Sequence, residues 1–277
     1  MKVFNTGETD LELKEKYNPE GSKLRRAQLR MLSMMKYIDA ICKENGLQYF
    51  LTGGNLLGAV RHGGFIPWDD DFDICVPKKD YRKLVKILRD SESEFVLQNH
   101  ETDRGHVLYW SVLRDTKSEY IKNDAVHTAK KYRGIQIDIF PVSYGVIAFG
   151  KKLVNICIRI NEKWIKLTKG AKKGLPFIIK ELLYYLPKYS LIPFFYLLSL
   201  FMPKSILSFS YEAVFKYSFE KKEIFPLSKI PYEDAVFSAP KNTMYFLERH
   251  FGENWQNLPS VVERAHHSVT DIIFLEK

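Results

Sequence analysis

The stretch Leu51–Val76, LTGGNLLGAVRHGGFIPWDDDFDICV, holds the most unusual grouping of residues in this chain of 277 residues. It contains a glycine pair, Gly53 and Gly54, continues through Arg61 and His62, and ends with four aspartates within five positions. Like charges at this spacing cost free energy when they are partly buried, unless a cation neutralises them. The aspartates therefore predict a cation site, and an exposed acidic turn is the alternative.

The segment from Phe72 to Val76 favours a short strand, because apolar and β-branched residues flank one acid. Side chains alternate faces along a strand, so Asp69, Asp71 and Asp73 are expected to point the same way. Carboxylate oxygens suit a hard divalent ion, and we predict that these three residues bind Mg²⁺ or Mn²⁺. A calcium loop that starts at Asp69 is excluded, because its sixth position is Ile74 where such a loop needs glycine.

The glycine pair stands between an expected strand end, Tyr49 to Thr52, and a helix that can begin near Asn55. Glycine lets backbone N–H groups approach a phosphate closely, and the start of a helix favours an anion. A glycine pair alone is equally consistent with a tight turn. The order of strand, glycine pair, short helix and alternating acids is, however, the signature of the nucleotidyltransferase fold. The residues predicted to contact the nucleotide are Gly53, Gly54, Arg61 and His62.

A further acid lies in the segment 134–140, GIQIDIF, which reads as a strand with Asp138 as its single acid. A lone acid among apolar residues needs a partner or a metal to offset its desolvation. In nucleotidyltransferases a third carboxylate comes from such a strand, beside the first pair. We therefore expect Asp138 to join Asp71 and Asp73 at one site, and a structural ion pair is the alternative.

The segment 53–74, GGNLLGAVRHGGFIPWDDDFDI, resembles the defining motif of the LicD family in a long and nearly gapless match. Members of this family, which include the fukutin-related enzymes, transfer phosphocholine or related phospho-alcohols to cell-surface glycans. The resemblance implies a metal-dependent transferase that moves phosphocholine from CDP-choline to a hydroxyl of a lipid-linked glycan of the teichoic acid, capsule or lipopolysaccharide type. It also implies catalytic roles for Asp71, Asp73 and Asp138.

Two positions depart from the family pattern. Asn55 stands where the family has threonine after the glycines, and Ser143 stands where an acid usually follows Phe140-Pro141. No role is therefore carried over to Ser143. The segment from Phe251 to Pro259 also resembles the family, which implies that the C-terminal part returns to the catalytic core. His266 and His267 are further candidates for phosphate contact or proton transfer, with ordinary surface residues as the alternative.

Two other functions stay open at this point. The first is the same reaction with another CDP-alcohol, such as CDP-ribitol or CDP-glycerol, as the donor. The second is a catalytically silent adaptor at the membrane surface in a polymer-assembly complex. A choline group would need aromatic faces, because cation–π contacts hold quaternary ammonium ions. The aromatic residues considered for this role are Trp68, Tyr109, Trp110, Tyr120 and Trp255.

Positive charge is concentrated in one part of the chain. The formal net charge is +9, and the segment 151–188 contains ten basic and two acidic residues, which leaves +1 for all other residues. The overlapping segment 176–203 is apolar and aromatic, but its prolines leave no run near the roughly 20 apolar residues that a membrane span needs. Basic and leucine-rich helices suit an anionic bilayer surface, and an ordinary helical insertion is the alternative. No motif for nucleic-acid binding accompanies the charge.

These patterns predict an α+β fold with a nucleotidyltransferase-like mixed sheet, flanked by helices and carrying a helical insertion. We expect helices at 20–45 and 78–89 and strands at 48–51, 95–98, 106–113 and 134–140. The expected division is a catalytic core at 1–145, a basic, apolar helical insertion at 146–230 and a returning segment at 231–277. Three cysteines without metal-type spacing and an N-terminus without an apolar run predict a cytoplasmic protein, at the inner face of the cell membrane if the insertion binds lipid.

Overall fold

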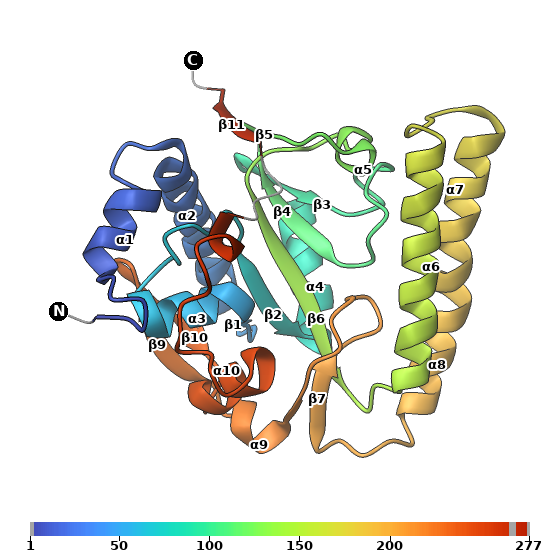
Figure 1. The fold of residues 1–277 in the computed structure, drawn as a ribbon. Coiled ribbons are helices and arrows are strands. Elements are labelled where there is room, and N and C mark those ends of the chain that lie inside the picture. The colour runs from blue at the N-terminus through green and yellow to red at the C-terminus, as the bar shows by residue number, and fades with distance from the viewer. Residues whose placement is uncertain (1–2, 266–269, 276–277) are drawn as a thin grey trace.

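A seven-stranded mixed sheet forms the centre of residues 3–265 and 270–275, which this computed structural model describes (Figure 1). Its main path follows the order β1, β2, β6, β4 and β3, and β7 and β8 extend it from β6. Strands β2 and β6 run parallel, and the other neighbours run antiparallel. This arrangement confirms the expected α+β class. The strands are β1 (Phe50–Leu51), β2 (Asp73–Pro77), β3 (Phe95–Gln98), β4 (Ser111–Asp115), β6 (Gln136–Tyr144), β7 (Ile206–Phe209) and β8 (Ser218–Glu220).

Strand β6 is the longest strand of the sheet and has three partners. Its first half pairs with β4, its second half pairs with β7, and β2 lies along it on the other side. Residues 137–143 are buried without interruption. A strand with neighbours on both sides and helices over its faces reads as a continuous apolar run, which explains why one acid, Asp138, stands out in it.

Helices cover the sheet where their apolar stripes predict them to do so. Helix α2 (Lys23–Glu44) buries Met31, Met35 and Ile38 along one face, and Ser22 caps its first turn. Helix α4 (Lys78–Asp90) starts directly after β2, in agreement with the helix expected at 78–89. The remaining helices outside the insertion are α1 (Asp10–Tyr17), α3 (Gly53–His62), α5 (Ala125–Thr128), α9 (Lys221–Ile224), α10 (Thr243–Phe251) and a 3₁₀ turn (Glu263–Ala265).

Two expected strands are shorter than the sequence indicates. The strand expected at 106–113 begins only at Ser111. Before it, His106 lies in a loop, and its Nε2 is 2.9 Å from the carbonyl oxygen of Trp110. The strand expected at 48–51 is reduced to β1. Two small sheets complete the fold: β5 (Ser118–Ile121) with β11 (Asp271–Phe274), and β9 (Ser228–Tyr232) with β10 (Ala235–Ala239).

The helical insertion stands at one side of the sheet as a long hairpin (Figure 1). Helix α6 (Ala148–Leu167) packs against α7 (Gly174–Leu186), and a π-helical turn (Pro187–Leu191) joins α7 to α8 (Ile192–Ser199) in one rod. The chain rejoins the central sheet at β7, so the insertion ends near residue 199 and the boundary expected at 230 is wrong. Leu207 and Phe209 cause the early return, because they are buried in the main core while β7 pairs with β6.

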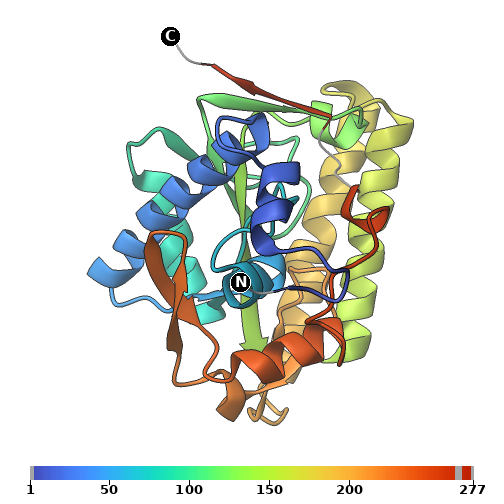
Figure 2. The ribbon, with the colours of Figure 1, turned by 60° about the vertical axis from the view of Figure 1, so that its left-hand side comes forward.

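The C-terminal segment lies beside the N-terminal half of the chain, as Figure 2 shows for the β9–β10 hairpin and α10. Glu233, in the turn of this hairpin, forms an ion pair with Arg25 of α2 at 2.9 Å, and α10 packs against α3. None of the helices in the described part of the chain combines the length and the apolar character that crossing a membrane requires.

Candidate functional site

The acids of two adjacent strands meet at one edge of the sheet. The parallel register of β2 and β6 pairs Asp73 with Asp138, and paired strands lie about 4.8 Å apart. Asp138 is buried, and one of its oxygens accepts a hydrogen bond of 2.6 Å from the Nε1 of Trp110. The side-chain amide of Gln136 donates to the other oxygen. Asp138 thus lies next to the first acidic stretch, as the strand pattern predicts.

The three acids on the predicted face, Asp69, Asp71 and Asp73, line one cavity of about 190 Å³ together with Gly53 and Gly54. Loss of surrounding water is the largest cause that raises the pKa of each carboxyl group, and the charges of the neighbouring acids raise it further. The pKa of Asp71 rises to about 6. No lysine or arginine is among the described residues that line the cavity, so the lining itself does not neutralise these carboxyl groups.

The glycine pair gives the carboxyl groups room at the start of α3. Gly53 has a φ of +53°, which side chains disfavour, and a β-carbon there would lie 3.6 Å from an Oδ of Asp73. At Gly54, a β-carbon would lie only 2.6 Å from an Oδ of Asp69. The backbone of α3 and the carboxylate cavity are therefore in direct contact, as the predicted phosphate cradle requires.

Asn55, the residue that departs from the family pattern, connects α3 to the acidic stretch. Its Oδ1 accepts a hydrogen bond of 2.5 Å from the backbone N–H of Asp73. Its Nδ2 lies 3.5 Å from the carbonyl oxygen of Asp71. Asn55 is buried, and these contacts fix the position of β2 relative to the helix start. An amide can both donate and accept in this place.

Arg61 and His62 do not line the cavity, in contrast to their predicted role as nucleotide contacts. The guanidinium of Arg61 is buried and donates to the carbonyl oxygen of Asn257 at 3.1 Å. His62 lies 2.5 Å from a carboxylate oxygen of Asp10, and burial lowers the pKa of His62 to about 4. Both residues sit at the far end of α3, about ten residues from the glycines, and they anchor terminal segments there. The structure therefore gives them a packing role.

Residues 46–169 match the protein family described as LicD/FKTN/FKRP, nucleotidyltransferase domain. Over 64 residues the chain is 44% identical to the lipopolysaccharide cholinephosphotransferase LicD of Haemophilus influenzae, a match that covers 23% of this chain and 24% of that protein. Residues 46–169 of this chain form a LicD-family domain. The matched LicD-family domain runs from just before β1 to just after α6 and contains all four acids of the site.

Other relatives of this chain carry different descriptions. Over 93 residues it is 34% identical to the ribitol 5-phosphate transferase FKRP of Mus musculus, over 33% of this chain and 18% of that protein. Over 64 residues it is 34% identical to mannosyltransferase regulator 4 of Saccharomyces cerevisiae, over 23% of this chain and 5% of that protein. The matched segments thus span a quarter or less of the length of each of these three relatives.

Carboxylate oxygens are suitable ligands for a divalent cation, although these carboxyl groups are not arranged around a common position. Among residues 3–265 and 270–275, no three His, Cys, Asp or Glu side chains form a metal-ligand group. The raised pKa of each of three neighbouring carboxyl groups nevertheless shows a cluster whose charged form a cation would stabilise. The assignment of Asp69, Asp71, Asp73 and Asp138 as metal ligands stays a prediction.

Two lysines that the sequence analysis missed face the acids. Burial lowers the pKa of Lys122, and the charges of Asp70, Asp138 and Asp71 oppose that shift. Burial also lowers the pKa of Lys130, to about 8, and Asp138 again opposes the shift. Both lysines flank the short helix α5, between β5 and β6, in a stretch without any motif that could have indicated them.

The C-terminal helix α10 contributes a histidine and a phenylalanine to the cavity. His250 and Phe251 line it together with Phe140, Phe209 and Phe215. Burial lowers the pKa of His250 to about 4, and its Nδ1 makes no hydrogen bond within the described residues. The family resemblance of the segment that starts at Phe251 was the signal that the tail returns here. His266 and His267 lie outside the described residues.

The aromatic residues considered for a choline pocket are not among those that line the cavity. Trp110 contacts a predicted site residue, because its indole N–H donates a hydrogen bond to Asp138. The hydroxyl of Tyr120 donates to the carbonyl oxygen of Asp70, and the hydroxyl of Tyr109 donates to that of Tyr184. Trp68 and Trp255 are buried in the main core. The aromatic lining of the cavity comes instead from phenylalanines of β6, β7, α10 and the loop after β7.

We expect the acid cluster to make stability depend on pH. In the folded protein the pKa of Asp71 is about 6, above the ordinary value of 3.8, so the folded state binds this proton more tightly than the unfolded state. Stability contributed by the protonated group is therefore lost as pH rises from about 4 to about 6. In metal-free buffer, Asp71→Asn should match the Tm of the wild type near pH 4 and exceed it at pH 7. Thermal unfolding of both proteins across this range measures the gap, and a gap that does not change with pH would contradict the expectation.

Proposed function

We propose that this chain is a metal-dependent transferase that moves phosphocholine from CDP-choline to a hydroxyl of a lipid-linked cell-surface glycan. The carrying observation is the cavity that Asp69, Asp71 and Asp73 line beside the glycines at the start of α3, with Asp138 next to Asp73 on the adjacent strand. The LicD-family domain supports a phosphotransferase of this kind. The reaction would take place at the cytoplasmic face of the membrane that carries the acceptor.

The acids of the cavity and the two nearby lysines have complementary tasks in this proposal. Asp71 and Asp73 would hold the cation with support from Asp69, and a bound Mg²⁺ or Mn²⁺ supplies charge neutralisation on the diphosphate. The backbone N–H groups at the start of α3 would contact the diphosphate. Lys122 and Lys130, whose charges already act on the acids, would contact it from the other side and take the place predicted for Arg61 and His62.

Asp138 is the candidate for the acceptor proton. It lies on the strand next to Asp73, and Trp110 fixes the orientation of its carboxyl group. A base held in this way can receive the proton of the attacking hydroxyl while CMP leaves from the other side of the phosphorus. Such a transfer depends mainly on positioning and electrostatics, so it needs no nucleophilic Cys or Ser.

The same cavity is compatible with another donor. The relative named as a ribitol 5-phosphate transferase supports the transfer of an alditol phosphate from its CDP donor, with ribitol or glycerol in the place of choline. The relative named as a cholinephosphotransferase has the higher identity, and this supports choline as the first choice. Phenylalanine faces in the cavity are suited to a quaternary ammonium group.

CMP release measured with different donors tests this choice. We expect CMP from CDP-choline in the presence of Mg²⁺ and a glycan acceptor, and little CMP from CDP-ribitol or CDP-glycerol under the same conditions. Chelation of the metal should stop the release, and Mg²⁺ should restore it. Lys130→Ala should raise KM for the donor about tenfold, because one charge-assisted contact to the diphosphate is lost. Release with an alditol donor alone would replace choline in the proposal, and release that survives chelation would remove the metal from it.

A catalytically silent adaptor is the alternative from another class. The relative named mannosyltransferase regulator 4 supports it, because that name describes a regulator and not a transferase. The cluster of acids with raised pKa argues against it, since such a costly arrangement is retained at functional sites. If Asp71→Ala and Asp73→Ala leave polymer decoration in cells unchanged, the adaptor is the better description.

A further inference from the structure

The outer side of the α7–α8 rod carries one continuous apolar stripe. Leu182, Leu186 and Leu197 are 61%, 69% and 57% exposed, although leucine side chains are usually buried. The stripe recurs every three or four residues through the π-helical turn, which is the spacing of one helix face. It consists of Leu175, Ile178, Leu182, Leu186, Tyr189, Pro193, Leu197 and Leu200.

Helix α6 adds a second exposed stripe next to a basic one. Phe149, Ile156 and Ile160 are exposed at helical spacing on α6. Exposed Lys152 follows Phe149 by three residues, and exposed Lys163 follows Ile160 by three, so both lysines are neighbours of the apolar stripe on the helix surface. Since α6 and α7 pack together, the two apolar stripes belong to one hairpin. We call the exposed apolar and basic residues of α6, α7 and α8 the outer face of the hairpin.

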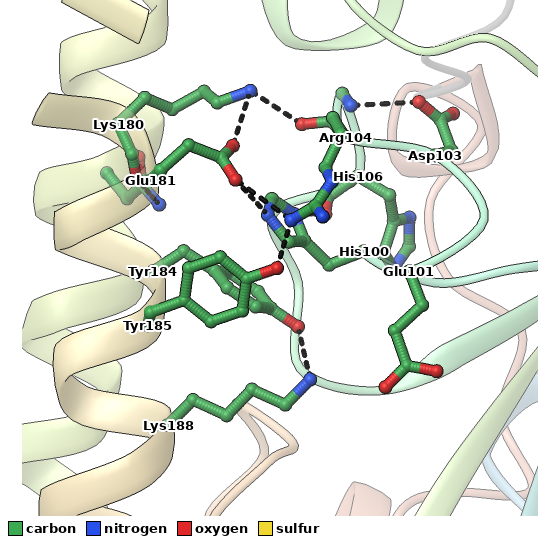
Figure 3. Close-up of polar contacts among 12 residues, drawn as sticks. His100, Glu101, Asp103, Arg104, His106, Lys180, Glu181, Tyr184, Tyr185 and Lys188 are labelled. Carbon is green, nitrogen blue, oxygen red and sulfur yellow. Dashed lines mark hydrogen bonds and ion pairs between the residues drawn. The ribbon is translucent and has the colours of Figure 1, made fainter. Parts of the chain in front are cut away.

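Polar contacts hold the inner side of α7 against the core, as Figure 3 shows. The ammonium group of Lys180 donates to the carbonyl oxygen of Arg104 at 2.7 Å. Glu181 lies 3.2 Å from the Nε2 of His100 and 3.0 Å from the guanidinium of Arg104. The ring of Tyr184 stacks on that of His100 with 3.7 Å between ring centres. These contacts fix the rotation of α7, so its leucines cannot turn inward.

The charges of the hairpin favour an anionic surface as the occupant of the outer face. In α7, the π-helical turn and α8, Glu181 is the single acid, and its contacts with His100 and Arg104 direct it to the inner side. The apolar side chains of the outer face come mainly from this rod, and its basic side chains come from α6. On α6, Lys152, Lys163 and Lys166 are exposed, and the single acid, Glu162, is half-buried. A second copy of this chain would bring two basic faces together, which like charges oppose. An anionic bilayer attracts the lysines and accepts the apolar side chains.

We propose that the outer face of the α6–α8 hairpin docks onto the surface of an anionic lipid bilayer, with the helices lying in the plane of the membrane. The rod from Leu175 to Leu200 is about 38 Å long at 1.5 Å per residue, so it offers a contact line much larger than a single exposed side chain. This docking rests on the hairpin alone and does not depend on which reaction the cavity catalyses.

Sedimentation with vesicles tests the docking of the full-length chain. Vesicles of phosphatidylglycerol and phosphatidylcholine in equal amounts should sediment the wild-type protein, and vesicles of phosphatidylcholine alone should sediment much less of it. The variant with Leu182→Ser, Leu186→Ser and Leu197→Ser should lose at least about tenfold in affinity, because three inserted side chains are removed. Lys152→Glu should cost about fivefold on the anionic vesicles, since one basic side chain near the surface is lost.

The matched control is the variant with Leu11→Ser, Val236→Ser and Val262→Ser. These three side chains are 52%, 51% and 73% exposed but lie away from the hairpin, so the control should bind vesicles like the wild type. Circular dichroism and CMP release from the donor in solution confirm that the variants are folded. Equal vesicle binding by the wild type and the leucine variant overturns the proposal. It is also overturned if the wild type ignores vesicles and forms a dimer that the leucine variant loses.

Discussion

Asp73→Asn is expected to lower kcat for CMP release about a hundred- to a thousand-fold, the range seen when one preorganised electrostatic contact is removed. Asp73 combines three features of the site: it borders the cavity, it pairs with Asp138 across β2 and β6, and a β-carbon at Gly53 would touch its carboxylate. An amide at this position keeps the shape of the side chain and removes the charge that a cation needs. Steady-state CMP release with CDP-choline measures the loss.

Stability distinguishes a site residue from a structural one in this experiment. Burial and the neighbouring acids raise the pKa of Asp73 well above its ordinary value, so its charged form destabilises the fold. The variant should therefore melt at the same or a higher temperature at pH 7, while its activity is lost. Mg²⁺ should raise the Tm of the wild type and leave that of the variant almost unchanged.

Asp90→Asn is the matched control, because Asp90 is exposed at the end of α4 and pairs with the neighbouring Arg89. It should change neither kcat nor the response to Mg²⁺. An Asp73→Asn variant that retains full CMP release would remove the carboxylate cluster from the reaction. A variant that loses activity and stability together would make Asp73 a structural residue.

The sequence predicts the acidic part of the site well because its geometry is local. Alternation along a strand predicts Asp71 and Asp73 on one side, and this depends only on residues close together in the chain. Both line the cavity, although β2 begins only at Asp73. The position of Asp138 could be predicted because an acid in a central apolar strand has few explanations. The parallel register that pairs it with Asp73 is then required by the fold.

The basic part of the site could not be predicted, because it depends on contacts between distant segments. Arg61 is close to the glycines in sequence, yet the helix α3 carries it away from them to the C-terminal segment. Lys122 and Lys130 are far from the motif in sequence, and the fold brings them close enough for the charge of Asp138 to act on both. His250 reaches the cavity only because α10 packs against α3.

The end of the insertion shows the same limit in another way. The segment after Pro203 is apolar, so composition cannot separate a helix that leaves the core from a strand that returns to it. The segment forms a strand because β7 pairs with β6, more than sixty residues away in the chain, and because Leu207 and Phe209 are buried in the main core. The exposed leucines of α7 and α8 are equally hidden from composition, because only the packing of Glu181 and Tyr184 shows which side faces outward.

Gly58→Ala is expected to destabilise the fold by about 2 kcal/mol or more, as overpacking of a well-packed interior does. A β-carbon at this position would lie 2.4 Å from the carbonyl oxygen of Gly64 and 3.1 Å from the backbone nitrogen of Ile66. Backbone atoms cannot move away as the end of a side chain can, so the loop that follows α3 must shift. Urea unfolding should show a lower midpoint, and any loss of activity should follow the loss of folded protein.

Gly54→Ala should do the opposite: it should lower CMP release about a hundredfold while the unfolding midpoint changes little. The atom that a β-carbon would meet here, at 2.6 Å, is a carboxylate oxygen of Asp69, which can rotate away. The rotation takes Asp69 out of the cavity, and a misplacement of about 1 Å in a catalytic site can cost a hundredfold in rate. If Gly54→Ala retains full activity, the contact between α3 and the acids has no role in the reaction. If it unfolds as readily as Gly58→Ala, the glycine pair serves only to let the helix begin, and the phosphate cradle must be sought elsewhere.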